Sequence, residues 1–291
     1  MKVLYIVSDN RSGSTLLQHL LALQPGVVAL GEIHRLDQMV KANEPCACGQ
    51  PLSQCPFWAK VASHAGLPLN EISTRPSFRL LRSDHGHIIS RRALKYGLGS
   101  LAHKLLVNDH RALANCFAIY HAASEITGKQ VVIDASKAPH HFLHLYMEDK
   151  PLFFPIFLIR DGRGVVWSKM KRTGIGAAKA AKVWLNVCKM MLALHKMLPN
   201  TLSVYVKYEE LCIKPKEALE RIVKNVDIAV TTLDLGLLPI ERHDLGGSPR
   251  FREKRPGNIE LDQRWRNEMP KEALIAFERV AGQMNRRFGY D

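Results

Sequence analysis

Residues 3–20 read VLYIVSDNRSGSTLLQHL, and the rest of the chain is organised around this stretch. Val3–Val7 is a short run of β-branched, aromatic and aliphatic residues, which is typical of a buried strand. Residues 8–13 are turn formers, and from Ser14 the leucines recur at helical spacing. A strand, a tight loop and a helix N-terminus together favour phosphate binding, because free backbone N–H groups and the helix dipole point at one place.

The loop in this stretch carries anion-binding groups but lacks one lysine. A nucleoside-triphosphate loop reads G-x-x-x-x-G-K-[ST], whereas here Ser8 replaces the first glycine and Ser14 replaces the lysine. Such a loop can hold one phosphate-like group but is poorly suited to a triphosphate with Mg²⁺. The alternative is an ordinary turn between a strand and a helix. The candidate anion ligands are Arg11, Ser12, Gly13, Ser14 and Thr15.

Composition points to an anionic partner. The 291 residues carry a formal net charge of +14, with a pI near 9.6. The charge is scattered, without the long basic run of a nucleic-acid tail, so we expect no nucleic-acid partner. No stretch reaches the ~18 apolar residues of a membrane span. The first apolar run is too short for a signal peptide, so we expect a cytoplasmic protein with free thiols.

The rest of the chain alternates strand and helix patterns. This order predicts a single α/β domain over residues 1–291, a three-layer sandwich with a mainly parallel central sheet. Pro155 indicates a bulge or an early break in one strand. Three segments stand apart from the alternation: a Cys/Pro-rich insert at 43–58, a helical insert at 84–127 with one or two long helices, and a basic loop at 236–264.

Ligands of such sheets bind beyond the C-terminal ends of the strands. Arg11, Lys137, Arg160 and Tyr208 each follow an expected strand. We therefore expect all four side chains to meet at one edge of the sheet.

The insert at 43–58 holds three of the six cysteines, Cys46, Cys48 and Cys55. Three zinc ligands, completed by His34 or His64, are one interpretation. The spacing matches no common zinc module, so we expect a thiol-containing loop and no metal.

Two motifs in combination resemble a known enzyme family. Residues 11–15, RSGST, follow the first strand, and residues 160–168, RDGRGVVWS, follow a later one. Together they resemble the phosphosulfate loop and the 3′-phosphate motif of sulfotransferases that use 3′-phosphoadenosine 5′-phosphosulfate (PAPS). Further segments that resemble the bacterial branch of this family are 208–211 (YEEL), 134–137 (DASK), the insert at 46–58 and 243–252 (HDLGGSPRFR).

The resemblance implies a transferase that moves the sulfuryl group of PAPS to a hydroxyl or amine of a small molecule or glycan. The resemblance also implies that this reaction requires no metal. Arg160 can bind a phosphate through two N–H groups, and Ser168 can donate a hydroxyl two helical turns later. The implied cofactor-binding set is the loop with Arg160, Ser168, Tyr208, Arg250 and Arg252.

The transfer needs cations and a base. The resemblance gives the cationic role to Arg11 and Lys137. Glu32, in the sequence Ala29-Leu30-Gly31-Glu32, resembles the Gly-Glu of carbohydrate-type sulfotransferases, in which the Glu is the base. His34 is the competing candidate, because imidazole titrates near neutral pH.

Two other functions remain open. A metal-dependent P-loop kinase would need a lysine at position 14 and a carboxylate for Mg²⁺, and Asp134 could supply only the second. A non-catalytic basic module would explain the charge but not two separate phosphate motifs. The sequence does not reveal the acceptor or the oligomeric state.

Overall fold

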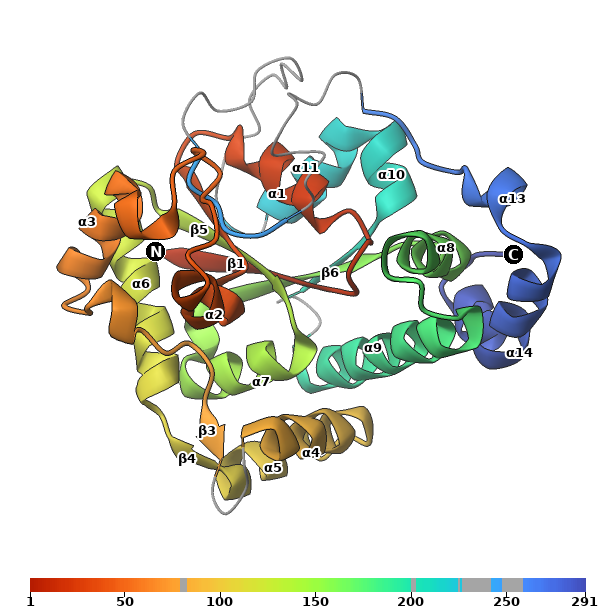
Figure 1. The fold of residues 1–291 in the computed structure, drawn as a ribbon, viewed down its shortest axis with the longest axis horizontal. Helices are drawn as coiled ribbons and strands as arrows, with labels where there is room; N and C mark the ends of the chain where they lie inside the picture. The colour runs from red at the N-terminus through yellow and green to blue at the C-terminus, as the bar shows by residue number, and fades with distance from the viewer. Residues whose placement is uncertain (79–82, 200–202, 225, 227–241, 248–258) are drawn as a thin grey trace.

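A five-stranded sheet, in the order β2-β5-β1-β6-β7, organises the molecule (Figure 1). Every neighbouring pair in it is parallel. The computed structural model describes residues 1–78, 83–199, 203–224, 226, 242–247 and 259–291. The strands are β1 Lys2–Ser8, β2 Val27–Gly31, β5 Val131–Lys137, β6 Phe153–Ile159 and β7 Val204–Lys207.

Alternate residues of β1 face opposite layers, as the period of a strand requires. Leu4 and Ile6 pack under α1 (Ser14–Ala22), α10 (Tyr208–Ile213) and α11 (Pro215–Val223). Leu17 and Leu21 of α1 are fully buried there, and each buried leucine contributes about 2 kcal/mol. The leucines whose spacing predicted this helix therefore form the face that packs on the sheet.

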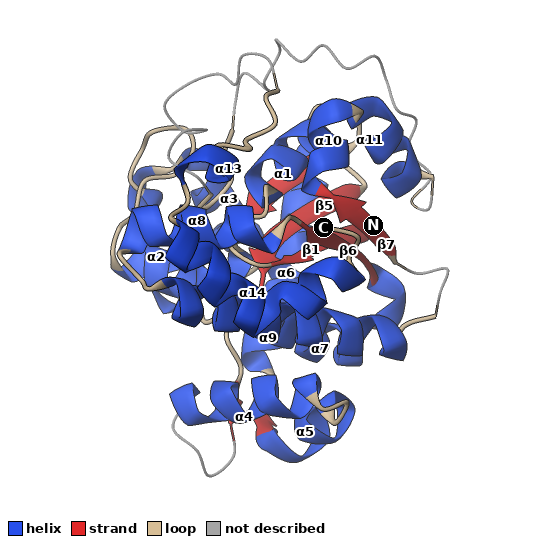
Figure 2. Cartoon of the chain, turned by 90° about the vertical axis from the view of Figure 1, so that its right-hand side faces the viewer, coloured by secondary structure: helices blue, strands red, loops and turns tan. Residues whose placement is uncertain are grey.

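Helices also cover the other face of the sheet. Val3, Tyr5 and Val7 pack with residues of α6 (Arg111–Thr127), α7 (Pro139–Glu148) and α9 (Ala177–Met197). The two helical layers lie on opposite sides of the strands (Figure 2). The predicted three-layer α/β architecture with a parallel sheet is thus confirmed.

A third apolar cluster lies beside the sheet, where α8 (Gly162–Thr173) and α9 meet α13 (Trp265–Glu268) and α14 (Lys271–Arg287). Fully buried Trp184 and Phe277 contact each other there, with ring centroids 5.9 Å apart. This cluster fixes α8 at the end of β6.

The segment expected to form one or two long helices contains three. They are α4 (Ser83–Lys95), α5 (Gly99–Leu106) and α6, and β4 (Val107–Asp109) separates the last two. Gly97 lies between the first two with a φ of 79°, a conformation that ends a helix. β4 pairs with β3 (Ser77–Phe78), and α4 and α5 lie outside α7 and α9 (Figure 1).

Pro155 does not break its strand. β6 is continuous through it and pairs with β1 on both sides of the proline, while the pairing with β7 begins only at Ile156. The shorter elements are α2 Leu36–Lys41, α3 Pro56–His64 and the 3₁₀ turns Ile33–Arg35, Leu52–Gln54, Leu69–Glu71 and Lys150–Leu152. Among the described residues, no helix combines the length and apolarity needed to span a membrane.

Candidate functional site

The predicted meeting of strand ends is found, but it divides into two clusters. The β6-side cluster consists of Arg11, Arg160, Ser168 and Tyr208. The β2-side cluster consists of Glu32, His34 and Lys137. The loop after β1 lies between them, because β1 is the central strand and its end pairs with Lys137 on one side and Leu158 on the other.

Arg160 is the centre of the β6-side cluster. Its guanidinium lies 4.4 Å from the centroid of the Tyr208 ring. Its Nη1 donates to the Arg11 carbonyl at 3.0 Å, and its Nη2 donates to the Asp262 carbonyl at 2.7 Å. These two bonds use two of the five N–H donors of the group. Arg160 thus also braces the loop, a role that the sequence did not indicate.

The two sequence motifs contact each other directly. Arg11 Nε donates to Ser168 Oγ at 3.0 Å. One residue on, Lys169 pairs with Asp9 of the loop at 2.5 Å. The loop after β1 and helix α8 therefore form one surface.

This surface has an excess of positive charge. Burial lowers the pKa of Arg11, and repulsion from Arg172 and Arg160 lowers it further, while Asp262 acts in the opposite direction. Guanidinium groups that crowd together in a partly buried site are stabilised by an added anion. Arg11 also has a φ of 75°, in the left-handed region. Such strain in a non-glycine residue is common at functional sites.

Gly13 is required at the turn from loop to helix. Its φ is 92°, and a Cβ there would lie 2.4 Å from the Tyr208 ring. Tyr208 is therefore placed between Gly13 and Arg160, and its hydroxyl accepts a hydrogen bond from the Asp262 N–H at 3.3 Å. Close packing of this ring on the loop leaves the backbone no room for a side chain.

The hydroxyl groups of the loop complete a donor set that fits phosphate or sulfate. Ser12 and Ser14 are buried at the start of α1. The Ser8 Oγ is buried with no hydrogen-bond partner among the described residues. Hydroxyls, guanidinium groups and a helix N-terminus are anion ligands, so the residues present fit the two anionic ends of PAPS.

On the β2 side, Glu32 and Lys137 form a buried ion pair. Lys137 Nζ lies 2.5 Å from Glu32 Oε1, which also accepts from the Gly247 N–H at 3.1 Å. Arg35 Nη1 donates to Oε2 at 3.3 Å. Burial alone would raise the pKa of Glu32, but Lys137, the Gly247 N–H and Arg35 together lower it. Glu32 is therefore a carboxylate at neutral pH.

Lys137 is held at the end of β5 in a conformation that is rare for lysine. Its φ is 64°. The side chain is almost fully buried, and its Nζ donates to the Ala135 carbonyl at 3.2 Å as well as to Glu32. Arg11 and Lys137, the two cations expected from the sequence, are thus both in the left-handed region at a strand end.

Residues 242–247 bring a distant part of the chain to Glu32. Leu245 lies beside β2, where its N–H donates to the Leu30 carbonyl and its carbonyl accepts from the Glu32 N–H. A Cβ at Gly31 would lie 2.1 Å from the Leu245 carbonyl oxygen. The glycine before Glu32 is therefore required by the close approach of this segment.

Asp244 anchors the same segment to α1. Its carboxylate accepts from Gln18 Nε2 at 3.0 Å and from Arg242 Nε at 3.1 Å, and it lies 3.5 Å from His19 Nε2. Burial would raise the pKa of Asp244, but His19 and Arg242 lower it to about 2. Sequence reasoning did not assign a role to any of these four residues.

His34 lies next to the ion pair. Its backbone N–H donates to Ser136 Oγ at 3.0 Å, and its ring centroid is 6.0 Å from that of His141. Burial, followed by repulsion from His141 and Lys137, holds its pKa well below the usual range. The imidazole is neutral at pH 7, and its buried Nδ1 has no hydrogen-bond partner among the described residues.

Asp134 is unavailable as a Mg²⁺ ligand. Its side chain is fully buried and accepts hydrogen bonds from the Tyr120 hydroxyl at 2.5 Å and the Ser136 N–H at 2.7 Å. Burial raises its pKa to about 6. The kinase interpretation therefore loses the carboxylate that the sequence offered.

Arg250 and Arg252 lie outside the described residues. Thr15 lies within them, near the β2 side: a Cβ at Gly247 would be 3.3 Å from Thr15 Oγ1. Residues missed by sequence reasoning are Asp9, Lys169, Arg172 and Asp262. A usable signal existed for Arg172, which follows Ser168 by four positions and so lies on the same face of α8.

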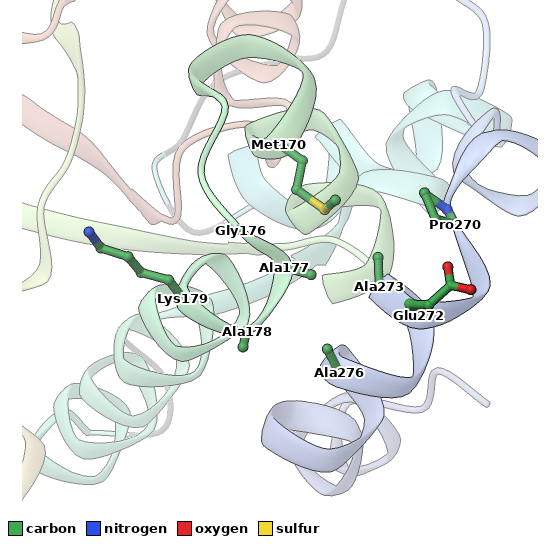
Figure 3. A pocket seen from close by; sticks show the side chains of 9 residues that line it. All are labelled: Met170, Gly176, Ala177, Ala178, Lys179, Pro270, Glu272, Ala273 and Ala276. Atoms are coloured by element: carbon green, nitrogen blue, oxygen red, sulfur yellow. The ribbon is translucent and has the colours of Figure 1, made fainter.

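A hollow of about 660 Å³ lies elsewhere, between the end of α8, the start of α9 and α14 (Figure 3). Its lining includes Met170, Ala177, Ala273 and Ala276. No predicted site residue lines it, and it offers few polar groups. The strand ends, rather than this hollow, carry the chemistry.

Comparison with known proteins gives one family match. The model of the sulfotransferase family matches residues 4–232. No curated protein matches the chain significantly.

Solved structures match the whole chain. The sulfotransferase domain of the Synechococcus PCC 7002 olefin synthase has 19% identity and a TM-score of 0.63, covering 100% of this chain and 95% of its own. The sulfotransferase domain from the curacin biosynthetic pathway has 18% identity and a TM-score of 0.60, covering 100% and 98%. Sulfotransferase STF9 from Mycobacterium avium has 13% identity and a TM-score of 0.50, covering 100% and 77%. At these identities the likeness establishes the fold.

Proposed function

This chain belongs to the sulfotransferase family, and on that premise we propose that it transfers the sulfuryl group of PAPS to a hydroxyl or amine acceptor. The observation that carries the proposal is the contact of the two anion motifs. Arg11 of the first motif donates a hydrogen bond to Ser168 of the second, and Arg160 donates one to the Arg11 carbonyl. Two motifs that contact each other suit one ligand with two anionic ends.

We assign the β6-side cluster to the donor. Arg11 and the start of α1 would hold the phosphosulfate, and Arg160 with Ser168 would hold the 3′-phosphate. For this, the Arg11 guanidinium exchanges Ser168 for an anionic group of the ligand. Asp262 and Tyr208 keep Arg160 in place, because its bond to a carbonyl and its stacking on the ring do not depend on the ligand.

We assign the β2-side cluster to the acceptor. Bound PAPS supplies an activated sulfuryl group: a bond forms from the acceptor oxygen or nitrogen to sulfur, while the bond from sulfur to the bridging 5′-phosphate oxygen breaks. Glu32, a carboxylate held by Lys137, takes the proton that the acceptor loses. Lys137 and Arg11 offset the negative charge that develops on the leaving phosphate.

Glu32 is the proposed base because three donors orient its carboxylate beside the loop. His34 is the alternative, with a neutral imidazole whose buried Nδ1 has no hydrogen-bond partner among the described residues. The acceptor class that we propose is a small molecule or a glycan. The six free cysteines favour a reducing compartment, so we propose the cytoplasm.

Titration calorimetry tests the donor. We expect 3′-phosphoadenosine 5′-phosphate (PAP) to bind without metal and ATP·Mg²⁺ to bind at least about 100-fold more weakly, because the loop lacks the lysine and the Mg²⁺ carboxylate. Preference for ATP·Mg²⁺ would favour the kinase, and binding of neither would favour a non-catalytic basic module. A transfer screen with radioactive sulfur in PAPS, against sugars, peptides, lipids and phenols, then identifies the acceptor.

A further inference from the structure

Three cysteines and one histidine meet next to α3. The Sγ atoms of Cys46, Cys48 and Cys55 and a ring nitrogen of His243 all lie within 4.8 Å of one another. The cysteines come from the insert at 43–58, and the histidine comes from the segment that reaches Glu32. His34 and His64, the fourth ligands considered from the sequence, are not part of this group.

The spacing of these atoms fits a tetrahedral ion. The Sγ of Cys55 lies 3.6 Å from that of Cys46 and 3.7 Å from that of Cys48. His243 Nδ1 lies 3.3 Å from Cys55 Sγ and 3.8 Å from Cys46 Sγ. A tetrahedral Zn²⁺ with Zn–S bonds of about 2.3 Å separates its sulfurs by about 3.8 Å. A disulfide would need about 2.05 Å, and all these cysteines are free.

The backbone around the cysteines is built as a tight turn. Cys46 N–H donates to the Gln50 carbonyl, Gly49 N–H donates to the Cys46 carbonyl, and Pro45 bridges to Pro51. Cys55 is the N-cap residue of α3. A helix N-terminus stabilises a thiolate, which is the form of cysteine that binds a metal ion.

His243 is fixed independently of the thiols. Its ring stacks on Phe57 with centroids 4.8 Å apart and an interplanar angle of 6°. Its carbonyl accepts a hydrogen bond from Trp58 Nε1 at 2.8 Å. Such outer contacts orient a metal-binding imidazole. The Nδ1 atom is thereby presented to the cysteines.

We propose that Cys46, Cys48, Cys55 and His243 bind a structural Zn²⁺ ion. Three thiolates and one imidazole in a closed tetrahedral set are typical of structural zinc rather than catalytic zinc. This proposal departs from our expectation that the cysteine insert binds no metal. The ion would join the insert at 43–58 to His243, four residues before Gly247, whose N–H contacts Glu32. It would therefore hold the β2-side cluster together without taking part in the transfer.

Metal analysis of the untagged 291-residue chain, purified after expression with zinc in the medium, tests the proposal. We expect about one zinc per chain by inductively coupled plasma mass spectrometry. We expect the zinc content of Cys48→Ser and of His243→Asn to be below about a tenth of the wild-type value. Cys48 is exposed, so its substitution spares the core. Cys212→Ser, at a buried cysteine outside the group, is the control for the loss of a thiol and should keep the zinc.

A second measurement keeps the proposal testable even if a variant fails to fold, because it uses the wild type. Zinc is removed from the wild type with a chelator and then added back. We expect the melting temperature to fall and to recover, with no recovery in Cys48→Ser. The proposal is overturned if the wild type, purified under reducing conditions, holds less than about a tenth of an equivalent of zinc and its melting temperature does not respond to added zinc. A Cys48–Cys55 disulfide under those conditions would also overturn it.

Discussion

The two clusters at the sheet edge differ in how their charges are arranged. On the β6 side, Arg11 and Arg160 crowd together with Arg172, and Asp262 is the carboxylate that offsets them. On the β2 side, Lys137 is matched by Glu32 at 2.5 Å. The first arrangement favours an added anion, whereas in the second each charged group already has a partner of opposite sign. This difference is the basis of our proposal that one side binds the donor and the other performs proton transfer.

The largest expected effect separates turnover from donor affinity on the β2 side. Glu32→Gln should lower kcat by about 10² to 10⁴, the usual contribution of a general base, and leave the affinity for PAP unchanged. Steady-state transfer assays and calorimetry check both quantities.

Glu44→Gln is the matched control, because Glu44 also contacts Arg35, at 3.5 Å, but does not contact Lys137. Circular dichroism checks that the fold remains intact when Lys137 has lost the carboxylate of Glu32. An unchanged kcat in Glu32→Gln would transfer the role of base to His34.

The next largest effect concerns the affinity for the donor nucleotide on the β6 side. Arg11→Gly should weaken PAP binding by about 10- to 100-fold, since a charge-assisted contact contributes about 1.5 to 3 kcal/mol. Glycine removes the guanidinium without opposing the φ of 75°. Calorimetry measures the affinity, and Lys171→Ala, an exposed cation on the same helix as Ser168, should leave it unchanged. Equal losses in both variants would reduce the cluster to a general field effect.

Gly13→Ala should break the contact between the loop and Tyr208. The left-handed φ costs about 1 kcal/mol, and the overlap with the ring adds about 1 to 3 kcal/mol. Urea unfolding measures the loss. Gly128→Ala isolates the first contribution, because Gly128 has a φ of 65° and a Cβ added there would meet no atom within 4 Å. If both variants lose the same stability, the ring does not limit the loop.

The smallest expected effect concerns the anchor of the β2 side. The pKa of Asp244 is lowered to about 2, so its ionised form adds stability above the unfolded pKa of about 3.9, and this is lost as the pH falls toward 2. About 1 kcal/mol should disappear between pH 6 and pH 3. Urea unfolding should show that the loss of unfolding free energy caused by Asp244→Asn shrinks by that amount over this pH range. A constant loss would show that the pairing with Arg242 does not stabilise the folded state.

The β6 side could be predicted from sequence because its parts are local. The loop after β1 and residues 160–168 after β6 each follow directly from a strand, and parallel strands bring their ends to one edge. The use of Arg160 as a brace could not be predicted, since its partner Asp262 is 102 residues away.

The β2 side was less accessible to sequence reasoning. Gly31 and Glu32 were recognised by resemblance, but their contact with Leu245 and Gly247 depends on a segment more than 200 residues later. Separations of 197 and 188 residues likewise hid His243 from Cys46 and Cys55 of the insert. The helical pattern of 84–127 was visible, but the helix end at Gly97 was missed, and the short strand β4 depends on its pairing with β3.

The central claim is that two strand-end motifs bind the two anionic ends of one nucleotide. Metal-free calorimetry with PAP and with adenosine 5′-phosphate, on the wild type and on Arg160→Ala, tests it most directly. We predict that the wild type prefers PAP by about 10- to 100-fold, and that Arg160→Ala reduces this preference to near one, because only the 3′-phosphate distinguishes the two ligands. Equal affinity of the wild type for both ligands, or an undiminished preference in Arg160→Ala, would contradict the claim.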